Sequence, residues 1–219
     1  MCAHYESVHD KALLKKHFGV ELPSELARRD VWPGYMSTFI RRHEHAVVGD
    51  EAVPVREALL GRFGLIPHWA KDDKIARHTY NARSETVAEK PSYRAAWRQR
   101  QYGLVLVDNF YEPSYESGRA VRWKIELASD DPFGIACLWD RWIDPVSGEL
   151  VVSFSMLTVN ADEHAVMRQF HKPGDEKRTP VVIAPELHET WLSADPAKAA
   201  ELMTWAHMPE LRAMPAPRV

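Results

Sequence analysis

The sequence predicts an α+β fold in a single domain, with an antiparallel sheet or an open, barrel-like sheet at its core and helices on its flanks. Three observations favour this class. The chain has 219 residues, of which 45% are hydrophobic, enough for one packed core. Its strand-like runs come in meandering groups separated by short helical segments, and not as regular βαβ units. No linker, low-complexity run or repeat divides residues 1–208, and residues 209–219 are expected to form a frayed tail.

The first half of the chain carries capping signals at two expected helices. Asp10 can cap a helix that ends at Gly19, because aspartate accepts from free helix N–H groups and glycine adopts the left-handed conformation. Ser84 is expected to cap a second helix, with an acidic residue in its first turn. The elements expected here are a helix over 10–18, a strand over 55–66, a helix starting at 84 and a helix over 91–98.

The second half is dominated by β-branched and aromatic runs. The segment Asp144-Pro145-Val146-Ser147-Gly148 has the composition of a hairpin connection between two of these runs. Asn160 and Asp195 are suited to cap two later helices. The expected strands cover 102–107, 121–127, 135–143 and 150–159, and the expected helices cover 161–170, 185–191 and 196–205.

Composition argues against several classes of protein. Cys2 and Cys137 are the only cysteines, which is too few for a disulfide framework and favours a reducing cytoplasm, with association to the nucleoid if the protein is bacterial. We expect no metal and no cofactor, because the sequence lacks convincing metal-ligand spacing. No apolar run reaches the roughly 20 residues of a membrane helix, so no membrane partner is expected, and the N-terminus does not resemble a signal peptide.

Charge is distributed unevenly along this acidic chain. The net charge is −3, yet residues 71–100 contain eight Lys or Arg and four Asp or Glu. An acidic protein with one basic stretch can bind a polyanion at that place while repelling it elsewhere. The alternative is that these residues form a solvated helix face. Trp69 stands beside the basic stretch and could stack on an unpaired base if it is exposed.

Cys2 becomes chemically unusual if Met1 is trimmed during synthesis. The new N-terminal residue would then carry an α-amine, with a reference pKa of about 7.7–8.0, next to a thiol of about 8.5. Both groups are partly available as nucleophiles near neutral pH, unlike the amine of a lysine. The alternative is that this cysteine stands at position 2 by accident, so the argument depends on the rest of the chain.

Four segments of the chain resemble the SRAP family, the SOS response-associated peptidase proteins. They are residues 1–5, 64–100, 104–113 and 153–183, and the most specific string is GLIPHWA followed by NARSET. The resemblance implies a protein that shields abasic sites in single-stranded DNA by bonding to them, with no cofactor. The α-amine of Cys2 would form an imine at the sugar C1′, and the thiol would close a thiazolidine ring. Nothing in the sequence demands an oligomer, so we expect a monomer.

The same resemblance assigns Asn81, Glu112 and His171 as companions of Cys2. Histidine titrates near neutral pH and suits proton transfer during opening of the sugar. Glu112 can accept a proton from the attacking amine, and Asn81 can hold Cys2 or the sugar by neutral hydrogen bonds. His164 is a rival to His171.

The resemblance also suggests DNA contacts and shows where this chain departs from the family. Trp69 would stack on a base, Arg83 would hold a phosphate, and Arg77 would extend the binding face, as would Arg94 and Arg98. The family typically begins Met-Cys-Gly-Arg, whereas Ala3 and His4 follow Cys2 here, so a DNA contact from His4 is expected to be weaker or pH-dependent. Pro113 follows Glu112, where the family often has tryptophan, and the segment HKPGDEKRTP lengthens the loop after His171.

Two other functions remain open from the sequence. Cys2 with His171 and Glu112 or Asn81 fits the nucleophile, base and orienting group of a cysteine peptidase or hydrolase, including one that removes its own Met1. Alternatively, the chain is a non-catalytic single-strand-binding module in which Cys2 is incidental.

Overall fold

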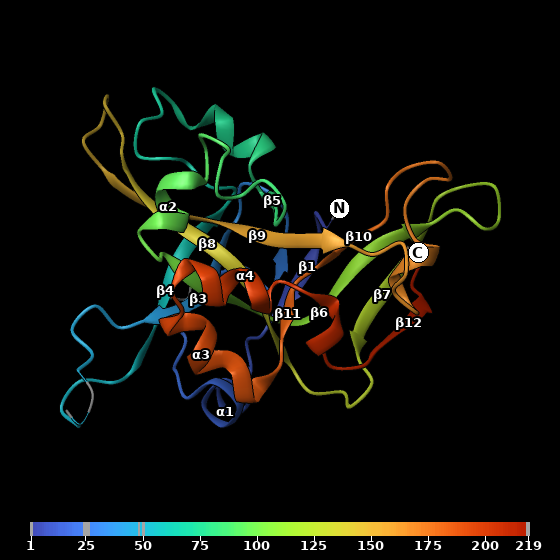
Figure 1. Ribbon diagram of the computed structural model, residues 1–219, viewed down its shortest axis with the longest axis horizontal. Coiled ribbons are helices and arrows are strands. Elements are labelled where there is room, and N and C mark those ends of the chain that lie inside the picture. Colours follow the sequence, from blue (N-terminus) through green and yellow to red (C-terminus); the bar gives the residue numbers. More distant parts are fainter. Residues whose placement is uncertain (1, 24–26, 48, 50, 218–219) are drawn as a thin grey trace.

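A closed five-stranded barrel forms the centre of the molecule (Figure 1). The structure, a computed structural model, describes residues 2–23, 27–47, 49 and 51–217. The barrel strands are β3 (Met36–Arg42), β4 (Arg56–Phe63), β6 (Tyr102–Ser114), β8 (Phe133–Ile143) and β9 (Leu150–Asn160). The barrel closes because each of these strands pairs with two others. β8 pairs with β6 and β9, β9 pairs with β4, β4 pairs with β3, and β3 pairs with β6. The β4–β9 pairing is parallel, and the other barrel pairings are antiparallel.

Alternate residues of β6 pack into two different hydrophobic clusters. Leu104 and Leu106 belong to the cluster that contains Trp191 and the other buried residues of the C-terminal helices, whereas Val105 and Val107 belong to the cluster around Phe154. Because both faces of this strand are covered, its first half, residues 102–107, is a continuous apolar run instead of alternating with polar residues. The flanking helices are α1 (Lys11–Leu13), η1 (Leu14–Phe18), η2 (Asp73–His78), α2 (Arg94–Arg98), η3 (Met167–Gln169), η4 (Pro185–Leu187), α3 (His188–Ser193), α4 (Pro196–Leu202) and η5 (Trp205–His207).

Shorter strands gather the predicted site residues at one end of the barrel. They are β1 (Tyr5–Ser7), β2 (Asp30–Val31), β5 (Asn81–Arg83), β7 (Val121–Leu127), β10 (Arg178–Pro180), β11 (Val182–Ile183) and β12 (Leu211–Pro215). Strands β5 and β10 both pair with the second half of β9, and β1 pairs with β6. Cys2, which precedes β1, contacts Asn81 of β5, so the start of the described chain lies beside β5 (Figure 1).

The predicted α+β class is confirmed. The sequence predicts an antiparallel sheet or an open, barrel-like sheet, and the barrel in the structure is closed. The strand over 121–127 coincides with β7, and the hairpin of β8 and β9 turns at the predicted segment. The Asp10 side chain accepts hydrogen bonds from the N–H groups of Ala12 and Leu13, as expected of a cap. That helix ends at Gly19, whose φ is 70°.

Three local predictions are wrong. No helix starts at Ser84, because its N–H donates to the carbonyl of Thr158 and continues the β5–β9 pairing, after which the chain forms turns. Residues 161–170 form turns and only the short helix η3. The tail expected to fray contains β12, because residues 211–215 hydrogen-bond along the free edge of β7. In addition, β6 runs on to Ser114 instead of ending at 107, and this extension carries Glu112.

Gly64 begins the loop that leads to Trp69, and it has no room for a side chain. Its φ is +120°, and a Cβ there would lie 2.4 Å from the Ala76 carbonyl oxygen. We expect Gly64→Ala to lower the free energy of unfolding by about 3 kcal/mol, since backbone strain and a clash with main chain add together. Gly118→Ala is the control, because its φ is +78° but nothing lies within 4 Å of the added Cβ. Urea unfolding of both variants measures the difference, and equal losses would contradict the steric argument.

Candidate functional site

Cys2 is buried at the start of the N-terminal strand. Its side chain has 0% relative exposure and packs in the cluster that includes Phe154. Its main-chain carbonyl accepts a hydrogen bond of 2.8 Å from Asn81 Nδ2, and its Sγ lies 3.8 Å from the His4 carbonyl oxygen. Burial, together with the charge of Glu112, raises the pKa of the Cys2 thiol well above its ordinary value. The thiol is thus held in its protonated form in this environment.

Asn81 connects the N-terminal segment to the barrel. It lies on β5 opposite Met156 of β9. Its side-chain amide donates to Cys2, and its own carbonyl accepts from the Tyr93 hydroxyl at 3.0 Å. These two bonds fix both the strand and the position of the Cys2 main chain.

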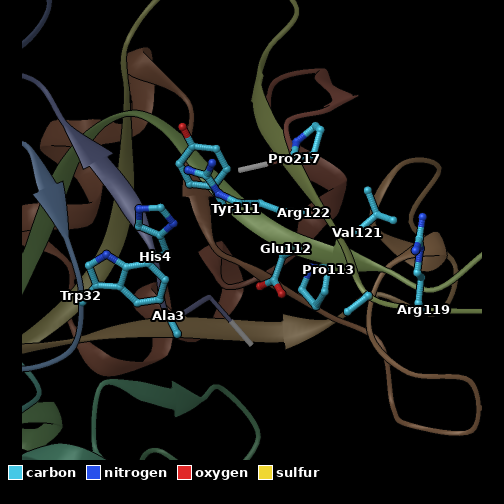
Figure 2. Close-up of a pocket in the computed structure, with 11 residues that line it drawn as sticks. Ala3, His4, Trp32, Tyr111, Glu112, Pro113, Arg119, Val121, Arg122 and Pro217 are labelled. Carbon is cyan, nitrogen blue, oxygen red and sulfur yellow. The ribbon is translucent and has the colours of Figure 1, made fainter. Parts of the chain in front are cut away.

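Glu112 is an almost fully buried carboxyl on the extended part of β6. It pairs with Trp123 of β7 and is 2% exposed. Burial raises the pKa of Glu112 to about 7. Figure 2 shows its carboxylate pointing toward the N-terminal segment at Ala3, in a pocket of about 770 Å³ that both residues line. A carboxyl in this state can both give and accept a proton near neutral pH.

His171 is held in a backbone conformation that is uncommon for a residue other than glycine. Its φ is +65°, and its N–H donates to the Pro113 carbonyl at 3.1 Å. Its Nε2 lies 2.9 Å from the Arg178 carbonyl oxygen, so the ring donates there, and its Nδ1 faces Glu112 Oε2 at 3.4 Å. Burial lowers the pKa of His171. The environment therefore favours the neutral forms of both His171 and Glu112, and one proton can pass between them.

The structure brings Cys2 and its three predicted companions to one end of the barrel. Asn81 contacts Cys2, Glu112 contacts His171, and the charge of Glu112 acts on the Cys2 thiol. The rival His164 instead accepts the N–H groups of Val166 and Met167 at its Nδ1, which stabilises a turn. No group of three or more His, Cys, Asp or Glu side chains in the described ranges could hold a metal ion. Within the same ranges, no helix is long and apolar enough to span a membrane.

Of the predicted DNA contacts, Arg83 lines a cavity with a site residue, and Trp69 and Arg77 are exposed side chains. Trp69 is 49% exposed, and its indole N–H donates to the Pro91 carbonyl. Arg83 ends β5, is half exposed, and lines a cavity of about 410 Å³ together with His171. Arg77 is exposed on η2 and lies near Asp73.

His4 lies in a stack of aromatic rings. Its ring is 4.0 Å from that of Trp32 and 4.4 Å from that of Tyr111, and the Arg122 guanidinium covers the far face of Tyr111 at 3.4 Å. His4 Nε2 contacts the Asp30 carboxylate. Although burial acts in the opposite sense, the hydrogen bond and charge of His4 lower the pKa of Asp30. A phosphate contact from His4 therefore requires this pair to open.

Sequence reasoning missed several residues that shape the site. Tyr93 and Arg178 were assigned no role in the site, yet the Tyr93 hydroxyl donates to the Asn81 carbonyl and the Arg178 carbonyl accepts from the His171 ring. Nothing in the local pattern around Trp32 or Tyr111 indicates the ring stack, because the partners come from separate segments of the chain. Glu176, which contacts Arg83, lies in the lengthened loop whose position the sequence left open.

Comparison with known proteins adds independent findings. The sequence model of the family described as SOS response associated peptidase (SRAP) matches residues 1–219. The chain is 33% identical to the abasic site processing protein YoqW of Bacillus subtilis, over a region covering 60% of this chain and 55% of that protein. It is 27% identical to the abasic site processing protein HMCES of Gallus gallus, with coverage of 65% and 47%. The chain thus spans about half the length of these curated relatives.

Solved structures resemble this one over nearly its whole length. A Bordetella bronchiseptica protein has 34% sequence identity and a TM-score of 0.86, covering 99% of this chain and 100% of its own. A Bacteroides thetaiotaomicron protein has 22% identity and a TM-score of 0.78, covering 99% and 93%, and shares the fold.

Proposed function

The chain belongs to the SOS response associated peptidase (SRAP) family, and from that premise we propose that it bonds abasic sites in single-stranded DNA covalently through Cys2. The observation that carries the proposal is that Cys2, Asn81 and the Glu112–His171 pair share one end of the barrel. The names of the curated relatives, which process abasic sites, agree with this substrate. We expect the protein to act as a monomer on DNA in the cytoplasm.

The proposed reaction begins once Met1 has been removed. The α-amine of Cys2 attacks C1′ of the ring-opened sugar aldehyde, and the carbinolamine loses water to give an imine. The thiol sulfur then bonds to the same carbon while its proton passes to the nitrogen, which closes a five-membered thiazolidine. One water molecule is lost overall. The second step is intramolecular, so it benefits from a high effective concentration that a lysine imine lacks.

The neighbouring groups supply protons and position in this scheme. Glu112, with a pKa of about 7, takes a proton from the Cys2 ammonium and returns it to the departing hydroxyl. Neutral His171 is the partner that exchanges a proton with Glu112. Asn81 holds the Cys2 main chain, so that the amine and the thiol approach the same carbon. Removal of Met1 also puts an ammonium beside the thiol, which lowers the pKa of the thiol from its buried value.

The proposed path of the DNA uses the exposed residues around this centre. Trp69 is exposed enough to stack on an unpaired base, and Arg83 can hold a phosphate next to the damaged sugar. Arg77 lies farther along the basic stretch and would extend the contact with the backbone. A general cysteine peptidase is less well supported, because such an enzyme needs a thiolate and burial opposes thiolate formation at Cys2.

The test compares three oligonucleotides of the same sequence with the processed protein, after intact mass has established that Met1 is absent. One carries an abasic site, one carries its tetrahydrofuran analogue, which has no aldehyde, and one is undamaged. We expect an adduct that survives denaturation only with the first, with the summed mass less one water. Equal retention of all three without such an adduct would favour a non-catalytic binding module, and turnover of unrelated peptides would favour a peptidase.

A further inference from the structure

The loop after His171 places a carboxylate between two arginines. The cavity of about 410 Å³ beside His171 is lined by Arg83, Arg178 and the loop residues Gly174, Asp175 and Glu176. Glu176 Oε2 lies 2.7 Å from Arg83 Nη1, and Glu176 Oε1 contacts Arg178 Nη1. The Asn160 side-chain amide donates to the same Oε1 at 3.4 Å. The carboxylate thus bridges an exposed and a buried guanidinium.

The two arginines depend on Glu176 to different degrees. Arg178 is 2% exposed and is held independently by Glu85, whose two oxygens lie 3.1 and 2.9 Å from its Nη1 and Nη2. It also donates to the hydroxyl and the carbonyl of Thr158. Arg83 is about half exposed, and among the described residues Glu176 is the acid in ion-pair contact with it. Displacing Glu176 would therefore leave Arg178 anchored and Arg83 available.

We propose that Glu176 occupies, in the free protein, the position that a DNA phosphate takes on Arg83, so that DNA must displace this carboxylate in order to bind. The inference rests on the proposed function, which gives Arg83 its phosphate. A carboxylate and a phosphate both offer two anionic oxygens to a guanidinium, so each satisfies the same donors. The exchange replaces one ion pair of Arg83 by another. The phosphate therefore contributes less binding free energy than it would at an arginine that had no carboxylate beside it.

The displacement needs only a rotation of the Glu176 side chain. The main chain of the next residue, Lys177, is fixed on both sides, since its N–H donates to Asp162 and its carbonyl accepts from Ala161. The Glu176 side chain itself is 34% exposed and can turn into solvent. Such a gate lowers the affinity for every strand that places a phosphate on Arg83. Undamaged DNA is then released more readily, whereas a damaged strand is retained by its covalent bond to Cys2.

The test is equilibrium binding of an undamaged single-stranded oligonucleotide, measured by fluorescence anisotropy at several salt concentrations. We expect Glu176→Gln to bind roughly fivefold more tightly at low salt, the scale of one partly exposed ion pair. The slope of log affinity against log salt should steepen by about 0.7, because one more phosphate contact is made without displacing an acid. Asp175→Asn is the matched control. It removes the same charge from the neighbouring residue of the same cavity, and its affinity should change less than twofold.

An Arg83→Ala background identifies the group through which Glu176 acts. If Glu176 blocks Arg83, the gain from Glu176→Gln disappears when Arg83 is absent. The proposal is overturned if the gain persists there, or if Glu176→Gln and Asp175→Asn bind equally. This measurement does not involve Cys2 or an aldehyde. If Glu176→Gln shows no gain in affinity while DNA binding is normal, the gate is wrong. That result is separate from a failure to form the adduct, which would contradict the proposed function.

Discussion

Cys2→Ser is expected to abolish the adduct that survives denaturation, lowering its yield by at least about a thousandfold, because the advantage of intramolecular closure by sulfur is lost. The α-amine remains, so the variant should still form an imine that borohydride reduction traps on abasic DNA. Serine differs from cysteine by one atom, and the hydrogen bond from Asn81 ends on the main-chain carbonyl, so the position of residue 2 is retained. Denaturing gel mobility with and without borohydride measures both outcomes.

Cys137→Ala is the control for this experiment, since Cys137 is the other cysteine and is equally buried. It lies on β8, where it pairs with Gly103 and Met156, and it should leave the adduct unchanged. A stable adduct in Cys2→Ser would exclude Cys2 as the group that closes the ring, and loss of the adduct in a folded Cys137→Ala would show that the effect is not specific to Cys2. Absence of borohydride trapping in both Cys2→Ser and the parent chain would exclude the imine as well.

The sequence predicts individual strands better than the way in which they close. Local alternation and turn composition identify β7, β8 and β9, because each property depends on neighbouring residues. Closure depends on the parallel pairing of β4 with β9 and on β8 meeting β6, which no local pattern contains. The same limit explains Ser84: its capping preference is real, but a carbonyl from a distant strand takes its N–H instead.

The site was predictable to the extent that its residues lie in recognisable motifs. Asn81 and Glu112 were identified with His171 by resemblance, and all three lie with Cys2 at one end of the barrel. The contacts that orient these side chains could not be predicted, because the contacts are made with main-chain groups. The positive φ of His171 and its bonds to the carbonyls of Pro113 and Arg178 have no signal in the local sequence.

Glu112→Gln is expected to slow adduct formation about a hundredfold, the usual scale of removing a general acid–base group. Glutamine retains the shape of the side chain but cannot carry a proton between the amine and the departing hydroxyl. The pH dependence of the rate that arises from Glu112, centred near its pKa of about 7, should vanish with it. Single-turnover rates with an abasic oligonucleotide across neutral pH measure both effects. An unchanged rate would remove Glu112 from the mechanism.

The same substitution should stabilise the fold at alkaline pH. Because the pKa of Glu112 is raised in the folded state, from 4.5 to about 7, the parent chain loses stability as pH rises through that window. The loss is on the order of 3 kcal/mol, and it is absent in Glu112→Gln. His171 acts in the opposite direction: its pKa is lowered, so it costs stability as pH falls below its ordinary value of 6.5. Comparing the two chains at each pH largely cancels that contribution.

Glu126→Gln tests whether the burial that raises the pKa of Glu112, and not the removal of any glutamate, explains this gain. Glu126 is also buried, on the neighbouring strand β7, but its carboxylate lies 2.7 Å from both Arg212 and Lys124. Its replacement should therefore lower the free energy of unfolding at pH 8, whereas Glu112→Gln raises it. Opposite signs in urea unfolding at that pH would show that the fold gives up stability at Glu112 to keep an ionisable carboxyl beside Cys2. The same sign in both variants would contradict that trade of stability for reactivity.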